Sequence, residues 1–121
     1  MKNLILVRHA KSSWAVPVQD IDRSISSRGV KNAHLIALKS VDIVPKSYIV
    51  WCSNAKRTKE TAFIFSQYLS IPIEVIQFSN ELYTFDDKQL LQIIKKCKNE
   101  HDNLILFGHN EAITKFVNKF G

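Results

Sequence analysis

Arginine and histidine stand next to each other at Arg8 and His9, directly after the apolar run 3–7. Another of the chain's four histidines, His109, comes shortly after a similar apolar run, 103–107. Neighbouring side chains that can both carry positive charge repel each other unless an anion lies between them. The pattern therefore indicates a negatively charged ligand close to where these runs end.

Two further charged residues follow apolar runs in the same manner. Arg57 comes shortly after the β-branched and aromatic run 47–52, and Glu81 comes shortly after the run 72–78. In a parallel sheet all strands point the same way, so the residues just past them collect at one edge, where open α/β sheets bind ligands. The residues that we expect at this edge are Arg8, His9, Arg57, Glu81 and His109.

This set of side chains suits a phosphoryl group. Guanidinium groups grip phosphate oxygens with paired hydrogen bonds, a neutral imidazole can attack phosphorus in line, and a second imidazole can donate to the equatorial oxygens. Ser53 or Asn54 is expected to cap the next helix, which places Arg57 in its first turn, where free N–H groups also attract anions. Because the arginines supply positive charge and no metal-ligand spacing is present, we expect neither metal nor cofactor.

The elements that position these residues alternate along the chain. Apolar runs predict strands over 3–7, 47–52, 72–78 and 103–107, and helical spacing of apolar residues predicts helices over 27–39, 54–69, 86–98 and 113–120. Four alternations of strand and helix favour a three-layer α/β/α sandwich with a mainly parallel sheet. The first strand is expected to be buried, and the third to lie nearer an edge because Pro72 cannot donate a hydrogen bond.

The composition fits one globular domain. Of the 121 residues 45% are hydrophobic and 23% are charged, and no apolar run approaches the roughly 18 residues of a membrane span. The N-terminal run is too short for a signal peptide, so we expect a cytoplasmic protein with no membrane partner. Cys52 and Cys97 lack metal or disulfide spacing and are expected to be reduced.

The net charge of +6 comes from 17 Lys and Arg residues against 11 Asp and Glu residues, which favours anionic partners in general. The lysines are spread along the chain rather than clustered, so we do not expect nucleic acid to be the partner.

Taken singly, each candidate residue has a more ordinary explanation. A histidine after a strand is more often a loop residue that contacts backbone groups, and an arginine in a first helical turn is usually solvated. We expect no functional role for His34, which lies inside a predicted helix, or for His101, which lies in a polar loop. For the others, repeated placement at the ends of strands favours a phosphate site.

Four segments of the chain resemble motifs of the histidine phosphatase superfamily, in that family's order. They are LVRHAKSSW, DIDRSISSRGVKNA, CSNAKRTKETA and LILFGHNEAI, which together cover nearly the whole chain. They are most similar to the SixA-type phosphohistidine phosphatases. The resemblance implies a phosphoglycerate mutase-like fold without a cap insertion, no cofactor, and a transient phosphohistidine formed on His9 as the nucleophile.

The resemblance also implies roles for the remaining candidates. Arg8, Arg57 and His109 would surround the transferring phosphoryl group, and Arg23, from DIDR, would guide the substrate phosphate. Glu81 stands where phosphoglycerate mutases keep their general acid. A phosphorylated imidazole is a better leaving group than an alkoxide, so an acid matters less in the SixA-type branch.

The chain departs from the family pattern in three places. Ala10 replaces the usual glycine after Arg-His and adds a methyl group where the backbone approaches phosphate. Lys11 and Ala15 replace residues typical of the mutases, which points away from that branch. Family members usually continue with at least one more strand, so we expect 1–121 to be one histidine phosphatase domain truncated at its C-terminus.

The length of the chain between Arg57 and His109 indicates which substrates the site can admit. This segment holds only a helix, a strand and a helix, which leaves almost nothing for an insertion that encloses a small phosphate ester. An open site can admit a phosphorylated side chain of another protein, so we expect a monomeric phosphatase that acts on protein phosphohistidine. The alternatives are a small-molecule phosphomonoesterase of the same superfamily and a module that binds phosphate without turnover.

Overall fold

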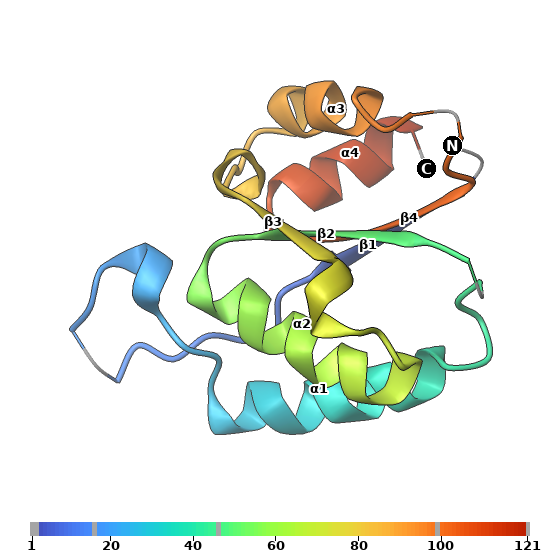
Figure 1. The fold of residues 1–121 in the computed structure, drawn as a ribbon. Coiled ribbons are helices and arrows are strands. Elements are labelled where there is room, and N and C mark those ends of the chain that lie inside the picture. Colours follow the sequence, from blue (N-terminus) through green and yellow to red (C-terminus); the bar gives the residue numbers. More distant parts are fainter. Residues whose placement is uncertain (1–2, 16, 46, 99, 121) are drawn as a thin grey trace.

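The computed structural model describes residues 3–15, 17–45, 47–98 and 100–120. Strands and helices alternate along these residues (Figure 1). The strands are β1 (Asn3–Arg8), β2 (Ile49–Ser53), β3 (Ile76–Ser79) and β4 (Asn103–Gly108). The α-helices are α1 (Ser27–Ser40), α2 (Lys56–Leu69), α3 (Asp87–Lys95) and α4 (Ala112–Phe120). Three short 3-10 helices join them, η1 (Asp20–Asp22), η2 (Ile73–Val75) and η3 (Asn80–Leu82).

The four strands form one parallel sheet in the order β1-β4-β2-β3. The third strand lies at an edge, as Pro72 predicts, but it begins only at Ile76 because the residues before it form η2. The expectation of a buried first strand is wrong. Within the described residues β1 pairs with β4 alone and its residues are half-buried or exposed, since an apolar run does not reveal how many neighbours a strand will have.

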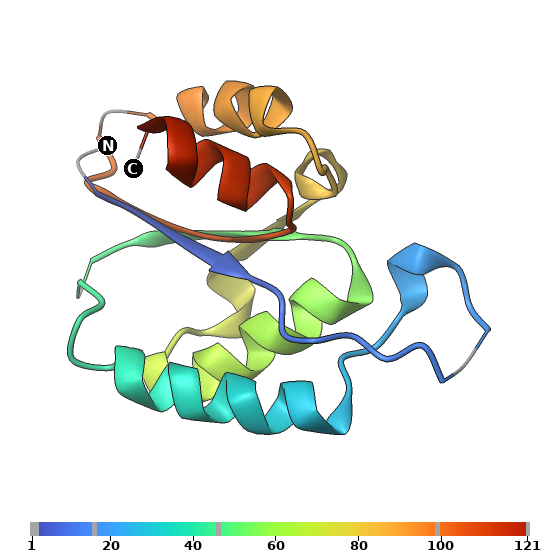
Figure 2. The same ribbon diagram turned by 180° about the vertical axis from the view of Figure 1, so that it is seen from behind.

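Helices cover both faces of the sheet, α1 and α2 on one and α3 and α4 on the other (Figures 1 and 2). The predicted three-layer α/β/α sandwich is therefore confirmed. Residues of the central strand β4 alternate between the two cores, with Leu104 and Leu106 on the α3–α4 side and Ile105 and Phe107 on the α1–α2 side. A strand covered on both faces needs apolar residues throughout, which explains the unbroken run.

The helices match their expected positions with small differences at the ends. Helix α3 ends at Lys95 rather than at residue 98, and α2 begins at Lys56 rather than at residue 54. Cys52 and Cys97 are free and buried, and His34 lies on α1 with its Nδ1 2.7 Å from the Tyr68 hydroxyl of α2. Among the described residues no helix is long and apolar enough to cross a membrane.

Helix α1 begins in direct contact with the backbone that follows β1. The Lys11 carbonyl oxygen accepts hydrogen bonds from the Ser26 N–H and from the Ser26 hydroxyl, at 2.7 and 3.1 Å. A Cβ atom on Gly29 would lie 2.3 Å from that oxygen, so only glycine permits this approach. The contact fixes the chain two residues after His9.

Replacing Gly29 with alanine should destabilise the protein by about 1–2 kcal/mol. The methyl group would meet main-chain atoms that cannot rotate away, which outweighs the gain in helix propensity. Ser27→Ala changes an exposed residue of the same helix and should stay within about 0.5 kcal/mol of wild type. Urea unfolding measures both variants, and equal stabilities would contradict the close packing.

Candidate active site

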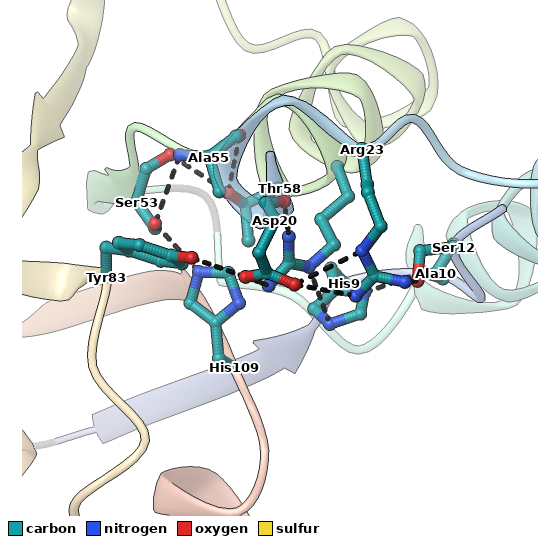
Figure 3. Close-up of polar contacts among 11 residues, drawn as sticks. His9, Ala10, Ser12, Asp20, Arg23, Ser53, Ala55, Thr58, Tyr83 and His109 are labelled. Atoms are coloured by element: carbon teal, nitrogen blue, oxygen red, sulfur yellow. Dashed lines mark hydrogen bonds and ion pairs between the residues drawn. The ribbon is translucent and has the colours of Figure 1, made fainter. Parts of the chain in front are cut away.

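The carboxyl ends of β1, β2 and β4 bring three of the predicted residues together. His9 follows β1, Arg57 lies in the first turn of α2 after β2, and His109 follows β4. The ring centroids of His9 and His109 are 5.3 Å apart. Arg57 Nε donates to His9 Nε2 at 3.3 Å. Figure 3 shows two groups of polar contacts, one centred on Asp20 that includes His9, and one in which His109 contacts Ser53.

His9 is held in the tautomer that leaves Nε2 without a proton. Its Nδ1 lies 2.6 Å from the Ala10 carbonyl oxygen, which can only accept, so Nδ1 carries the hydrogen. Burial lowers the pKa of His9 against the effect of that hydrogen bond, and the charges of Arg57 and Arg8 lower it further. The ring is therefore neutral at pH 7, with the Nε2 lone pair on the side of Arg57.

Ala10 packs against an apolar cluster next to the site. The methyl lies against a small apolar cluster of Ile25, Ala33 and Ile64 between α1 and α2. The Ala10 N–H donates to the Thr61 hydroxyl of α2 at 2.9 Å. The difference from the family's glycine is thus accommodated by apolar packing next to His9.

His109 is almost completely buried, with 1% of its surface exposed. Its Nε2 lies 2.8 Å from the Ser53 hydroxyl, and its Nδ1 is buried without a hydrogen-bond partner among the described residues. Burial, followed by the charge of Arg57, lowers the pKa of His109 to about 3. A second neutral imidazole with one unused nitrogen therefore stands beside His9.

The expected helix cap at Ser53 or Asn54 is wrong. The N-cap of α2 is Ala55, which has no capping side chain. Ser53 instead contacts His109 and accepts a 3.3 Å hydrogen bond from the Ala55 N–H, while Asn54 donates to the Asn80 side chain. Arg57 nevertheless lies in the first turn of α2, as expected.

Arg57 is a buried cation whose hydrogen bonds are all directed into the site. Beside the contact with His9, Nη1 donates to the Asp20 carbonyl oxygen at 2.6 Å and Nη2 donates to the Asp20 carboxylate at 3.0 Å. A charge that is 1% exposed needs such a counter-ion, because its burial without one is very costly.

Asp20 lies at the centre of this network (Figure 3). Its Oδ1 accepts from Arg23 Nε at 3.1 Å and lies 3.0 Å from Arg23 Nη2, and its Oδ2 accepts from Arg57 and from the Tyr83 hydroxyl. The hydrogen bond from Tyr83, with those from Arg57 and Arg23, lowers the pKa of Asp20 to about 2. Asp20 is thus a carboxylate at any pH near neutrality.

Arg23 joins the site through Asp20 and is itself buried. Its Nη1 donates to the Ser12 hydroxyl at 2.8 Å, and its guanidinium carbon lies 3.4 Å from the centre of the Trp14 ring. These contacts fix the guanidinium plane on the loop between β1 and α1. Arg23 thus belongs to the same hydrogen-bonded network as Arg57 and His9, and its contact with a substrate phosphate stays a prediction.

Arg8 and Glu81 are not drawn into the network. Arg8 is the exposed last residue of β1, and its side chain makes no hydrogen bond or ion pair with the described residues. Glu81, in η3, accepts from Lys96 Nζ at 2.9 Å, and both side chains are exposed. The structure therefore does not bring Glu81 together with the histidines, because η3 follows the edge strand β3 and turns this side chain toward α3.

Sequence analysis missed Asp20 and Tyr83 as members of the site. Asp20 stands three residues before Arg23, a spacing that allows an ion pair, so an inspection of DIDR for charge pairs would have indicated it. Tyr83 carries no such signal, since it lies 63 positions from Asp20 and is an ordinary aromatic residue in its segment.

A family model described as the histidine phosphatase superfamily (branch 1) matches residues 4–112. The chain belongs to the histidine phosphatase superfamily. The candidate phosphohistidine phosphatase SixA of Agrobacterium tumefaciens superposes with a TM-score of 0.83 at 27% identity, covering 96% of this chain and 74% of that chain. The corresponding Nakamurella multipartitia protein gives 0.78 at 25% identity, covering 93% of this chain and 62% of that chain.

An uncharacterized protein of Mycobacterium leprae, ML1117, is 30% identical over 112 residues, which cover 89% of this chain and 66% of that protein. The chain thus spans 66% of this relative's length and 62% of the Nakamurella protein's. These similarities confirm that this superfamily member has the phosphoglycerate mutase-like fold and is of the SixA type.

Stability should fall below about pH 6.5 because the folded state excludes a proton from His109. The pKa of this ring is about 3 when folded and near 6.5 when unfolded, so acid favours the unfolded chain. The stabilisation is full above pH 6.5, and its loss for one group reaches about 1.4 kcal/mol per pH unit.

Urea unfolding at about pH 7.5 and about pH 5 measures this dependence. His109→Gln cannot take up the proton and should lose less stability between the two conditions than wild type. His101→Gln changes a partly exposed histidine outside the site and should keep the wild-type dependence. A wild-type slope in His109→Gln would contradict the assignment.

Proposed function

We propose that this chain is a metal-independent phosphatase that hydrolyses phosphohistidine on a protein, through a phosphohistidine intermediate on His9. The observation that carries the proposal is the unprotonated Nε2 of a neutral His9 next to the buried guanidinium of Arg57. A nucleophile and a fixed positive charge at hydrogen-bond distance are what phosphoryl transfer requires. The SixA proteins that this chain resembles are named as candidate phosphohistidine phosphatases, which supports the same substrate class.

In the first step His9 Nε2 attacks phosphorus in line, and the bond from phosphorus to the substrate imidazole breaks. The substrate ring leaves as neutral imidazole when its other nitrogen carries a proton. The positive charge that appears on the His9 ring is stabilised by the Ala10 carbonyl oxygen, which accepts from Nδ1–H. Arg57 and Arg23 neutralise charge on the transferring oxygens.

In the second step a water molecule attacks the phosphorus of the phosphohistidine. His9 leaves as a neutral imidazole, and inorganic phosphate is released with the protons of the water. His109 lies close enough to donate to a phosphoryl oxygen from a protonated ring nitrogen, since its ring centroid is 5.3 Å from that of His9. Its neutral form keeps a second positive charge away from the nucleophile's lone pair.

The surroundings of the site favour a protein substrate over a small ester. Between α2 and β4 the described chain holds only η2, β3, η3 and α3, so no insertion covers this edge. Two exposed aromatic side chains flank the site, with Trp14 against Arg23 and the Phe85 ring centroid 5.4 Å from that of His109. Exposed aromatic residues around a charged centre suit contact with a protein surface.

Replacing His9 with asparagine should abolish turnover, because it removes Nε2, the unprotonated imidazole nitrogen next to Arg57. The assay measures phosphate release in EDTA from a histidine-phosphorylated phosphocarrier protein and traps the acid-labile phosphoenzyme. His101→Asn is the matched control and should retain the wild-type rate. Wild-type turnover by His9→Asn would refute the proposed nucleophile.

Glu81→Gln should change the rate on the phosphohistidine protein by no more than about twofold, because imidazole needs little help to leave and Glu81 contacts Lys96 instead of the site. Lys96→Gln removes the other member of this ion pair, and its rate on the phosphohistidine protein should also stay within about twofold of wild type. A large loss in Glu81→Gln confined to alkyl phosphate esters would identify Glu81 as a general acid for those substrates. A large loss on phosphohistidine would contradict the expectation.

A further inference from the structure

The strongest anion-binding donors of the site are already occupied by a carboxylate of the same chain. Asp20 accepts hydrogen bonds from Arg57, Arg23 and Tyr83 (Figure 3). Paired guanidinium groups and a hydroxyl are the donors that a phosphoryl group uses. Arg57 holds Asp20 with Nη2 and contacts the nucleophile with Nε, so one guanidinium joins the carboxylate to His9.

The two sides of this contact differ in burial. The side chains of Arg57 and Arg23 are 2% and 9% exposed, whereas the side chain of Asp20 is 43% exposed. Asp20 belongs to the short helix η1, none of whose residues is buried, and residues 17–19 before it are exposed as well. The donors are therefore fixed in the protein, while the acceptor stands at the surface on a segment with little packing.

Arg23 has anchors that do not depend on Asp20. It donates to the Ser12 hydroxyl and stacks on Trp14, and the main chain beside it is held where the Ser13 N–H donates to the Ser24 carbonyl oxygen at 2.8 Å. Outward movement of Asp20 would break its carboxylate contacts. It would also break the contacts of its carbonyl oxygen with Arg57 Nη1 and with the Arg23 N–H at 3.2 Å. The Arg23 guanidinium would keep its contacts with Ser12 and Trp14, and Arg57 would keep its hydrogen bond to His9. The N–H groups of both that now bind Asp20 would be free to bind another anion.

We propose that Asp20 is a tethered anion that occupies the phosphoryl position in the free protein and is displaced by the substrate phosphoryl group. The Tyr83 hydroxyl, which donates to Asp20 in the free protein, then donates to phosphate as a further binding residue. The inference rests on the proposed function only in requiring that this edge binds a phosphoryl group. Displacement favours dianionic groups that engage both arginines, and the return of Asp20 promotes release of inorganic phosphate.

Calorimetric titration with inorganic phosphate at constant ionic strength tests the displacement. Asp20→Ala removes the competing carboxylate, so its affinity for phosphate should be at least about tenfold higher than that of wild type. Asp22→Ala removes the same charge from η1, but its side chain makes no hydrogen bond or ion pair with the described residues, so the phosphate affinity of this variant should change by less than about twofold. This control separates competition for the donors from a general loss of negative charge.

The role of Tyr83 is measured in the Asp20→Ala background, where Tyr83 cannot act through the carboxylate. Adding Tyr83→Phe keeps the ring against His109 but removes the hydroxyl, and phosphate binding should weaken about threefold or more. Unchanged affinity would remove Tyr83 from the phosphate-binding residues. Circular dichroism checks the fold of each variant, and Asp20→Asn serves in the same titration if Asp20→Ala does not fold.

Phosphate affinity of Asp20→Ala equal to that of Asp22→Ala, or weaker than wild type, would overturn the displacement and make Asp20 a positioning residue for the arginines. Absence of phosphate binding in every variant would overturn it as well. Tighter binding by Asp20→Ala without turnover of the phosphohistidine protein by wild type would uphold the displacement and refute the proposed function. The binding experiment therefore tests the displacement of Asp20, and the turnover experiment tests the proposed function, so either proposal can be refuted without the other.

Discussion

The buried positive charge of Arg57 is the constraint on which the rest of the site depends. A guanidinium that water cannot reach must find its hydrogen bonds within the protein, and removing one partner from such a pair typically costs about 3–5 kcal/mol. Arg57 meets this requirement through His9 and through both the carbonyl and the carboxylate of Asp20. One side chain in the first turn of α2 thereby holds the nucleophile after β1 and the loop that leads into α1.

The same charge shapes the protonation of the histidines. Burial makes the charged form of each ring unfavourable, and the neighbouring guanidinium adds to this, so both His9 and His109 stay neutral while Asp20 stays ionised. A cation, an anion and two neutral rings thus share one small region. This arrangement keeps Nε2 of His9 unprotonated, and the positive charge that a phosphoryl group needs comes from the guanidinium groups.

Departures from the family pattern are absorbed by local packing. Ala10 packs against the apolar cluster between α1 and α2, and the close contact at Gly29 holds the chain just beyond it. Among the described residues the edge strand β1 pairs with β4 alone. The exposed aromatic residues Trp14 and Phe85 and the proposed displacement of Asp20 both fit the proposal that a phosphorylated side chain enters from another protein.

The amino-acid sequence by itself determined the order of strands and helices, the parallel sheet and the meeting of His9, Arg57 and His109 at one edge. Hydrophobic periodicity and strand direction are local properties, and they suffice to place residues relative to strand ends. Only the tertiary structure decided that β1 is half-buried, that Ser53 contacts His109, and that Glu81 faces Lys96. It also decided that Asp20 and Tyr83 meet across 63 positions of the chain. Which charges neutralise one another depends on distances between segments that no local pattern encodes.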